Sequence, residues 1–314
     1  MTANHTGRYA PSPTGPLHLG NLRTAVLAWL FARSAGARFL IRIEDLDPDR
    51  SREPAVAQQL ADLSSLGLDW DDPEELLRQS DRTGAYQEAV AELDREGLVY
   101  ECYCTRREIR EAASAPHDDR VGELADGAYP GTCRELSVAG LGERQRSGRP
   151  AALRARCGAA KVEYEDRLHG AGSGTVDDFV LRRNDGTYGY NLAVVVDDAF
   201  QGIGEVVRGA DLLSSTPRQI WLGRQLGLAP IESWTHVPLV LGDDGRPLAK
   251  RHGAISLADR AARGESPAQT LSLLAASVDL CEPGEPTDTA MLLERFVPEQ
   301  LPVMDATLPL GSGR

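Results

Sequence analysis

The 314-residue chain lacks the long apolar stretches that a membrane-spanning helix requires. No run of about 18 apolar residues occurs, so we expect no membrane span. The N-terminal segment MTANHTGRYAPSP has no basic flank followed by an apolar core, and it does not resemble a signal peptide. These absences predict a cytoplasmic protein.

The chain also has few cysteines, and its net charge is negative. Five cysteines in a cytoplasmic chain argue against a disulfide framework, and we expect Cys157 and Cys281 to be plain thiols. The net charge of −13 argues against broad, non-specific binding to nucleic acid, which depends on neutralising phosphates. Arginines nevertheless cluster locally, either as a basic face or as separate solvated side chains. The clusters are Arg106, Arg107 and Arg110; Arg144, Arg146 and Arg149; Arg154 and Arg156; and Arg182 and Arg183.

The first hundred residues alternate strand-like and helix-like segments. Strands are expected from Tyr9 and over Phe39–Ile43, and helices over Leu22–Ser34, Glu53–Leu66 and Arg82–Glu96. Such alternation indicates an α/β fold with a parallel sheet and crossover helices. A hydrophobic content of 41% is sufficient for the core of one large or two modest domains.

From about Val99 the pattern changes to short strands, glycine-rich turns and arginines, which indicates an insertion over residues 101–178. Asn184-Asp185-Gly186 then predicts a hairpin turn. Further strands are expected at Leu192–Val196, Glu205–Arg208 and His236–Leu241.

The remaining segments are predicted to be mainly helical. Ser215, Thr216 and Pro217 begin a helix that Gly227 ends. Helical segments follow Ile255, and the tail from Glu282, which contains proline and glycine, is expected to be loosely packed or partly disordered.

The stretch Arg8–Asn21, RYAPSPTGPLHLGN, carries the strongest functional signal. A loop without bulky side chains lets a ligand approach the backbone, and it leads into a helix whose N-terminus offers free N–H groups to a phosphate. His18 adds a side-chain donor at that position. Taken alone, the pattern is more typical of a proline-rich turn with one surface histidine.

Three further blocks remove that ambiguity. They are IRIEDLDPDR (41–50), YNLAVVVDDAFQGIGEVVRGADLLSSTPRQ (190–219) and PLAKRHGAIS (247–256). In this order, over about 250 residues, the four blocks resemble class I aminoacyl-tRNA synthetases of the glutamyl type, the first block being similar to the HIGH motif. The resemblance implies a Rossmann-type catalytic domain in two halves, 1–100 and 179–241, with an inserted zinc-containing α/β subdomain over 101–178. It also implies a KMSKS-like loop and a helical C-terminal region over 242–314, without an anticodon-binding domain.

A glutamate ligand carries two carboxylates and one ammonium, and so it requires two cations and one anion. Arg8 and Arg208 match the family's carboxylate-binding positions, Glu44 matches the ammonium site, and Tyr190 and Ser12 match further polar contacts. The resemblance does not assign each carboxylate to one arginine. Without it, Glu44 is more typical of a solvated acidic run and Tyr190 of a core position.

The resemblance also implies an ATP site, with Mg²⁺, formed by His18, Gly20, Asn21 and Lys250. His18 and Lys250 are the expected catalytic residues, because both act on phosphate charge. The loop departs from the family pattern, since Pro247 replaces its first lysine and Ala249 its serine. The neighbouring Arg246 and Arg251 are expected to replace part of the missing charge.

Cys102, Cys104 and Cys133 supply three of the four ligands that a structural zinc ion usually takes. On chemistry alone, ordinary thiols are the simpler interpretation, because no fourth cysteine or histidine follows. The pattern is, however, similar to a zinc site in short paralogues of the glutamyl synthetases, in which Tyr129 occupies the fourth position. The resemblance therefore implies one structural zinc ion.

The closest resemblance is to the short paralogues that attach glutamate to queuosine in tRNA(Asp). It rests on the chain length, HLGN in the first motif and the Cys/Tyr/Cys pattern. It implies a ligase that forms glutamyl-adenylate without tRNA, then transfers glutamate to the queuosine of the anticodon loop. Arg106, Arg107, Arg110, Arg154 and Arg156 are the expected phosphate-contacting face, and a monomer is expected.

Three alternatives remain open at this point. The first is a minimal discriminating glutamyl-tRNA synthetase that charges a tRNA 3′ end, which the missing domains disfavour. The second is a small-molecule nucleotidyltransferase, which does not need Glu44, Tyr190 and Arg208 together. The third is a non-catalytic RNA-binding paralogue, which His18 and Lys250 disfavour and Pro247 keeps open.

Overall fold

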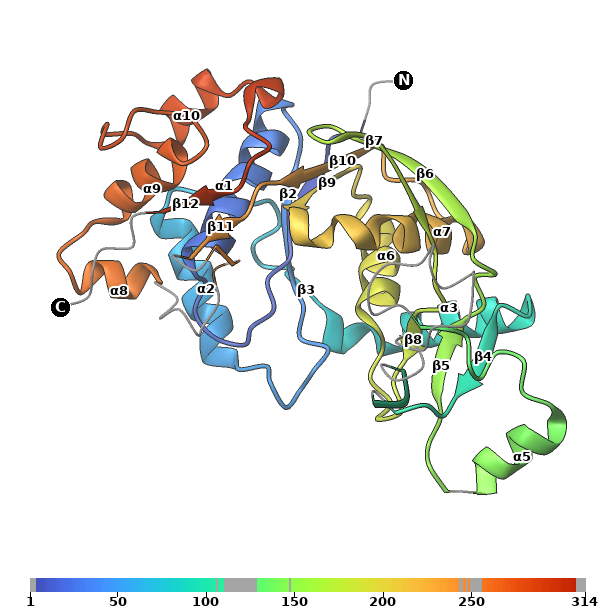
Figure 1. Ribbon diagram of the computed structural model, residues 1–314. Coiled ribbons are helices and arrows are strands. Elements are labelled where there is room, and N and C mark those ends of the chain that lie inside the picture. Colours follow the sequence, from blue (N-terminus) through green and yellow to red (C-terminus); the bar gives the residue numbers. More distant parts are fainter. Residues whose placement is uncertain are drawn as a thin grey trace.

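The protein is described here from a computed structural model that covers residues 4–105, 107–109, 129–146, 148–242, 245–246, 248 and 256–308. Central strands separate two groups of elements (Figure 1). The C-terminal helices α8 to α10 lie on one side, near α1, and the segment that carries β4, β5 and α5 lies on the opposite side. Within the described residues, no helix is both long enough and apolar enough to cross a bilayer.

Two parallel ladders form the centre of the molecule. The first has the order β1-β2-β3, and the second has the order β7-β6-β10-β9, in which only the β6–β7 hairpin is antiparallel. The two ladders meet where Thr6 O accepts hydrogen bonds from the backbone of Gly204 and Glu205. Their strands are β1 (Gly7–Tyr9), β2 (Phe39–Ile43), β3 (Leu77–Arg78), β6 (Lys161–Asp166), β7 (Gly170–Thr175), β9 (Glu205–Gly209) and β10 (Ser233–Val237). The predicted parallel α/β architecture is therefore confirmed.

Helix α1 (Leu19–Ser34) lies against β1 and β9, and most of its surface is buried. A helix that is apolar on nearly all sides belongs inside a core. It begins three residues before the expected start, because His18 caps it. The crossover helices α2 (Glu53–Ser65) and α3 (Thr83–Arg95) lie within a residue of the expected segments at each end.

The strand expected at Leu192–Val196 is wrong, because these residues belong to helix α6 (Tyr190–Gln201). A short run of β-branched residues is compatible with either element, and the period of the longer segment decides. The buried residues of this helix recur at a spacing of three to five positions, which fits a helix and not the alternation of a strand: Leu192, Ala193, Val194, Asp197 and Asp198. Gly202 ends the helix with a φ of 66°, in the left-handed region that suits glycine.

The expectation of a loosely packed tail is wrong for residues 282–308. Helix α10 (Thr289–Arg295) places Leu292 in the main core, and the Phe296 ring meets Phe31 edge to face with centroids 5.0 Å apart. Strand β12 (Ala306–Thr307) pairs with β11 (Val240–Leu241). The strand expected over His236–Leu241 is divided between β10 and β11.

A smaller antiparallel sheet of order β4-β5-β8 carries the metal-ligand candidates. The predicted turn after β8 forms, since Arg182 pairs with Tyr188 across it. The remaining elements are β4 (Val99–Cys102), α5 (Val138–Arg146), β5 (Ala152–Ala155), β8 (Val180–Arg182), α7 (Thr216–Gln225), α8 (Leu257–Ala261), α9 (Pro267–Ala276) and the 3-10 helices Gln79–Arg82, Ala210–Ser215 and Pro298–Gln300. The division into four domain segments stays a prediction.

Candidate active site

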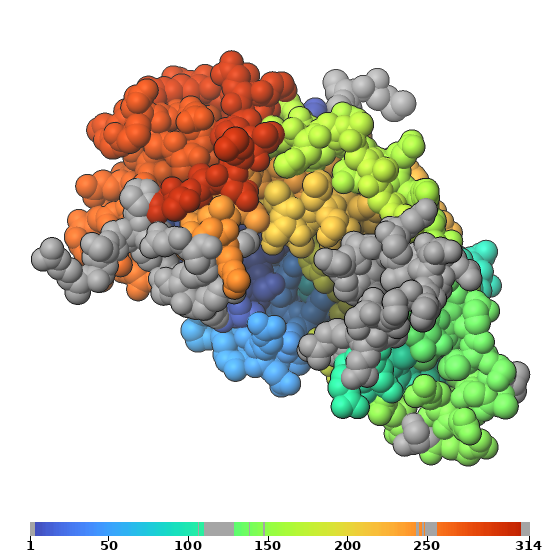
Figure 2. Space-filling model, viewed as in Figure 1, coloured from blue at the N-terminus to red at the C-terminus, as the bar shows by residue number. Residues whose placement is uncertain are grey.

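A cavity of about 620 Å³ opens at the carboxyl ends of β1, β9 and β10. Figure 2 shows a hollow in this face of the molecule, with the blue N-terminal segment at its floor. Open α/β sheets bind ligands at this edge. The structure brings together here all the described residues that the sequence predicted for glutamate and ATP: Arg8, Ser12, His18, Gly20, Asn21, Glu44, Tyr190 and Arg208.

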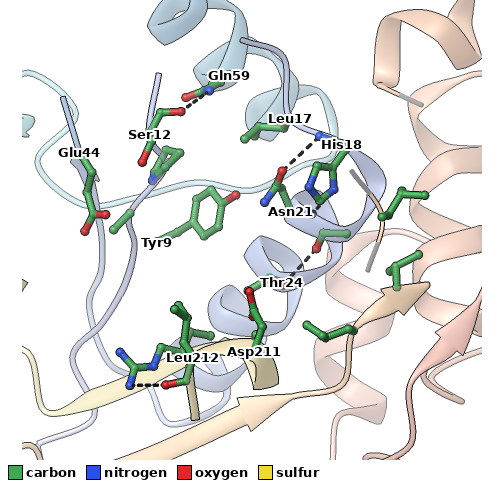
Figure 3. A pocket seen from close by; sticks show the side chains of 18 of the residues that line it. Tyr9, Ser12, Leu17, His18, Asn21, Thr24, Glu44, Gln59, Asp211 and Leu212 are labelled. Carbon is green, nitrogen blue, oxygen red and sulfur yellow. Dashed lines mark hydrogen bonds between the residues drawn. The ribbon is translucent and has the colours of Figure 1, made fainter. Parts of the chain in front are cut away.

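His18 is the N-cap of α1 (Figure 3). Its Nδ1 accepts a hydrogen bond from the Asn21 backbone N–H at 3.3 Å, and Asn21 Oδ1 accepts in return from the His18 N–H at 3.4 Å. Burial lowers the pKa of His18, although Asp211 opposes this, and the ring is therefore neutral near pH 7. Because Nδ1 holds the lone pair, the proton lies on Nε2, which makes Nε2 a donor.

Gly20 is required beside this histidine. A Cβ atom at position 20 would lie 3.1 Å from both Cε1 and Nδ1 of the His18 ring, closer than nearly all real Cβ contacts. The absence of a side chain therefore lets the imidazole lie against the first turn of α1. The motif glycine has a packing reason as well as the expected role beside ATP.

Arg8 and Glu44 belong to a buried ionic network. Arg8 donates to Asp198 from Nε at 3.0 Å and from Nη2 at 3.3 Å. Arg42 donates to the same Asp198 from Nη1 at 2.6 Å and to Glu44 from Nη2 at 3.2 Å. Burial raises the pKa of Glu44, while Arg42 and Arg8 oppose this effect. Two guanidinium groups thus share two carboxylates.

Arg208 is held in a different way. Its Nε donates to His236 Nε2 at 3.0 Å, and its Nη1 donates to Gln219 Oε1 at 2.7 Å. Its Nη2 donates to Thr216 Oγ1 at 2.9 Å and to Leu212 O at 3.3 Å. All four acceptors are neutral. Among the described residues, no carboxylate lies within ion-pair distance of this guanidinium, which is only 5% exposed.

Tyr190 and Ser12 complete the glutamate-binding set. Tyr190 begins α6, and burial raises the pKa of its phenol, while the nearby Arg208 opposes this effect. Ser12 lies in the loop after β1, where its carbonyl oxygen accepts from Gln59 Nε2 at 3.1 Å (Figure 3). Gln59 also donates to Gly15 O at 2.7 Å, so it fixes both ends of this turn.

The KMSKS-like loop lies mostly outside the described residues, including Pro247, Ala249, Lys250 and Arg251. Two described residues of this block lie near the cavity or the first motif. Leu248 lines the cavity, and Ser256 forms an antiparallel bridge with His18. The place expected for Lys250 in the ATP site stays a prediction.

The metal-ligand candidates form a tight cluster at the edge of the smaller sheet. The sulfur atoms of Cys102, Cys104 and Cys133 all lie within 4.8 Å of one another. The Tyr129 hydroxyl lies 3.4 Å from Cys102 Sγ and 3.7 Å from Cys104 Sγ. A hydrogen bond with Cys104 lowers the pKa of the Cys102 thiol, despite burial. Three sulfurs around one point could hold a metal ion.

The expectation of a phosphate-contacting arginine surface is wrong for Arg154. Arg154 is buried, because it donates to Asp178 O at 2.7 Å and its guanidinium lies 3.7 Å from the Tyr129 ring centroid. Arg156 is paired with Glu135 at 3.3 Å. Arg106 and Arg110 lie outside the described residues. Arg154 therefore supports the cysteine cluster and does not face a phosphate backbone.

Sequence reasoning missed Arg42, Gln59, Asp198 and His236. Asp198 carried a signal, since two acids in the apolar run VVVDDAF must be buried together with cations. Arg42 carried the same signal, because it interrupts the buried strand FLIRI. No local pattern indicated Gln59 or His236, whose partners are distant in the sequence.

The comparisons with known proteins identify the family of the chain. The family model for the catalytic domain of class I tRNA synthetases (E and Q) matches residues 5–276. A glutamyl-Q tRNA(Asp) synthetase of Nocardia farcinica is 57% identical over 301 residues, which cover 96% of this chain and 92% of that relative. A protein of the same name from Symbiobacterium thermophilum is 45% identical over 313 residues, which cover 96% and 95% of the two chains.

A solved structure of a glutamate tRNA ligase has a similar fold. The glutamate tRNA ligase of Elizabethkingia meningosepticum, solved in complex with its amino acid, superposes with a TM-score of 0.79 at 25% identity. The match covers 97% of this chain and 67% of that one. The chain therefore belongs to the class I aminoacyl-tRNA synthetases of the glutamate and glutamine group, which are ligases, and within it to the glutamyl-Q tRNA(Asp) synthetase family.

Proposed function

We propose that the protein activates glutamate with ATP in the absence of tRNA and then transfers the glutamyl group to queuosine in tRNA(Asp). One observation supports the first step most directly. The buried guanidinium of Arg208, which has no carboxylate partner among the described residues, faces a cavity that also includes the N-terminus of α1. The names of the relatives support the acceptor.

The charges of the cavity match glutamate. With Glu44 ionised beside a ligand ammonium, the guanidinium groups of Arg8, Arg42 and Arg208 exceed the carboxylates of Glu44 and Asp198 by one positive charge in the inner part of the site. Asp211 also lines the cavity, but it is exposed and acts on His18, at the part assigned to ATP. Glutamate carries one net negative charge, whereas glutamine carries none. Burying an unpaired charge is costly, so the cavity favours the acidic amino acid.

Within that site, Arg208 is assigned to one ligand carboxylate and Glu44 to the ligand ammonium. Arg8 contributes to the second carboxylate with N–H groups that Asp198 does not occupy, and Tyr190 and Ser12 supply polar contacts. Their assignment rests on the shared cavity and on the match to the family motifs. Holding both reactants in one cavity supplies proximity, which is the main requirement of adenylate formation.

ATP is assigned to the opposite part of the cavity, along the first turn of α1. His18 Nε2–H, the N-terminal N–H groups of α1 and the neighbouring Gly20 and Asn21 would face the phosphates. Lys250 would neutralise charge that develops on the phosphates during the reaction, with Mg²⁺ supplied together with ATP. Leu248 lines the same cavity, and Ser256 forms a bridge with His18.

The cysteine cluster is proposed to hold one structural zinc ion. Cys102, Cys104 and Cys133 would supply three thiolates, and the Tyr129 hydroxyl lies where a fourth ligand is needed. When bound, the zinc ion would cross-link β4 to the segment around Tyr129 and would take no part in the chemistry. Arg154, stacked on Tyr129, offsets the negative charge of such a ligand set.

The acceptor is tested by locating the transferred label. Purified protein, ATP and [14C]glutamate are incubated with tRNA(Asp) that contains queuosine and with the same tRNA lacking it. Only the modified tRNA is expected to be labelled, and RNase digestion is expected to release the label with an anticodon-loop fragment. Label on the 3′-terminal adenosine would instead establish a glutamyl-tRNA synthetase. The activity is expected in the cytoplasm, where these substrates occur.

A further inference from the structure

Behind Arg208 lies a buried pair that the activation chemistry does not require. His236, on β10, and Asp166, at the end of β6, are both fully buried. His236 Nδ1 lies 2.6 Å from Asp166 Oδ2, and His236 Nε2 accepts from Arg208 Nε at 3.0 Å. The three side chains form one line of hydrogen bonds that ends at the cavity.

The contacts of the ring assign the protons of this line. Arginine has only donors, so His236 Nε2 must carry a lone pair toward Arg208. Thr216 Oγ1, which accepts from Arg208 Nη2, also lies 3.2 Å from His236 Nε2, where its hydroxyl proton can be donated to the same lone pair. The proton of the neutral ring is then on Nδ1, directed at Asp166. Asp166 is held as a carboxylate by the backbone N–H groups of Leu168, His169 and His236, at 3.0 to 3.1 Å.

This arrangement has a consequence for Arg208. A carboxylate in direct contact with its guanidinium would cancel the charge that the cavity offers to a ligand. His236 separates Asp166 from Arg208, so the guanidinium is fixed in orientation and still has a neutral neighbour. Four of its five N–H groups are held by neutral acceptors, and one on Nη1 remains for the ligand or for the nearby Tyr190 hydroxyl.

We infer that His236, with its tautomer fixed by Asp166, is a positioning residue for Arg208 and thereby sets the preference of the site for an acidic amino acid. Its side chain is not part of the cavity lining. Its function is to present one lone pair to Arg208 Nε while remaining uncharged. This inference rests on the proposed activation of glutamate and extends it to residues outside the cavity lining.

The test compares two substitutions of His236 by ATP–pyrophosphate exchange. His236→Phe keeps a flat ring of similar size against Trp234 but removes the acceptor. His236→Gln keeps a polar atom near the position of Nε2 and does not depend on a tautomer. We expect His236→Phe to raise the KM for glutamate about 10- to 100-fold, with the KM for ATP within about twofold of wild type. His236→Gln is expected to stay within about threefold for both substrates.

A second pair of variants tests the contribution of Asp166. Two backbone amides hold Oδ1 and one holds Oδ2, so the amide nitrogen of Asp166→Asn falls on the Oδ2 side, opposite Nδ1, and reverses the tautomer. The His236 backbone N–H loses its acceptor in both backgrounds, so this cost cancels in the comparison. We expect it to raise the glutamate KM about tenfold in the wild-type background and less than about twofold in the His236→Gln background. This comparison does not require the His236→Phe variant to fold.

His169→Phe is the matched control. It removes a hydrogen bond to the backbone oxygen of His236 at 3.0 Å and leaves the Arg208 acceptor intact, so both KM values are expected to stay near wild type. An unchanged glutamate KM in a folded His236→Phe variant would overturn the inference. Equal losses in the Phe and Gln variants, or equal costs of Asp166→Asn in both backgrounds, would do the same. If the wild type itself shows no glutamate-dependent exchange, the proposed function is wrong instead.

Discussion

The different surroundings of Arg208 and Arg42 lead to a prediction about activity and stability. Both side chains are buried in or behind the same cavity. Arg42 bridges Asp198 and Glu44, whereas Arg208 donates only to neutral groups. Replacing each by methionine removes a similar volume and one positive charge. The two variants are expected to fail in different ways.

Removing Arg42 takes away a cationic partner of both Asp198 and Glu44, and only Asp198 keeps a direct ion pair, with Arg8, among the described residues. Breaking a buried ion pair typically costs about 3–5 kcal/mol, so we expect Arg42→Met to lose stability on that scale. Removing Arg208 leaves no charge behind, only neutral acceptors beside an open cavity that water can reach. We expect Arg208→Met to cost about 1–2 kcal/mol in stability. Its kcat/KM for glutamate should fall roughly 30- to 5,000-fold, because a ligand carboxylate loses its cation. This decrease corresponds to a loss of about 2–5 kcal/mol of transition-state stabilisation.

Thermal unfolding and glutamate-dependent pyrophosphate exchange measure the two effects separately. This prediction places the side-chain carboxylate of glutamate on Arg208. Glutamine has no side-chain charge, so its low activity should change much less in Arg208→Met, and discrimination between the two amino acids should collapse. Arg224→Ala, on the exposed side of α7, is the control and should leave both assays unchanged. An Arg208→Met variant with wild-type discrimination would refute the charge argument. An equally stable Arg42→Met variant would refute the description of the ionic network.

The chain has two lysines, Lys161 and Lys250, so amine-reactive labelling followed by mass spectrometry should show that ATP protects Lys250 alone. Lys250→Ala should slow adenylate formation more than it weakens glutamate binding. Equal losses would indicate that Lys250 only helps to bind the substrates. Protein purified without chelator should contain about one zinc per chain, and Cys104→Ser should lower zinc content and melting temperature together; fully stable, zinc-free protein would contradict this. Burial lowers the pKa of His18 and of His236 below the ordinary histidine value of about 6.5. Just below pH 6.5 the unfolded chain therefore binds more protons than the folded chain, and the free energy of unfolding should fall as the pH drops through this range. Melting curves from pH 7.5 to 5 test this, and a double His→Gln variant should show a weaker dependence.

The sequence by itself determined the elements whose signals are local. The strand Phe39–Ile43 lies where the pattern predicted it, because a short apolar run bounded by turns is typical of a buried strand. The N-terminus of α1 was also readable, since His18, Gly20 and Asn21 act on one another within a single turn. The candidate ligands of the cavity could be selected for the same reason, because they lie in short motifs.

Only the tertiary structure decided how those residues are paired. Asp198 lies 190 positions from Arg8 in the sequence, so no local pattern could show that they share an ion pair or that Arg208 lacks one. The tail after Glu282 looked loose because proline and glycine give no helical period, yet Phe296 packs on Phe31 because burial outweighs weak local propensity. The contact of His236 with Arg208 arises because neighbouring strands β9 and β10 place the two side by side. The motifs predicted which residues line the site. The register of the parallel sheet determines that Arg208 is paired with His236, so that its positive charge stays available for a ligand.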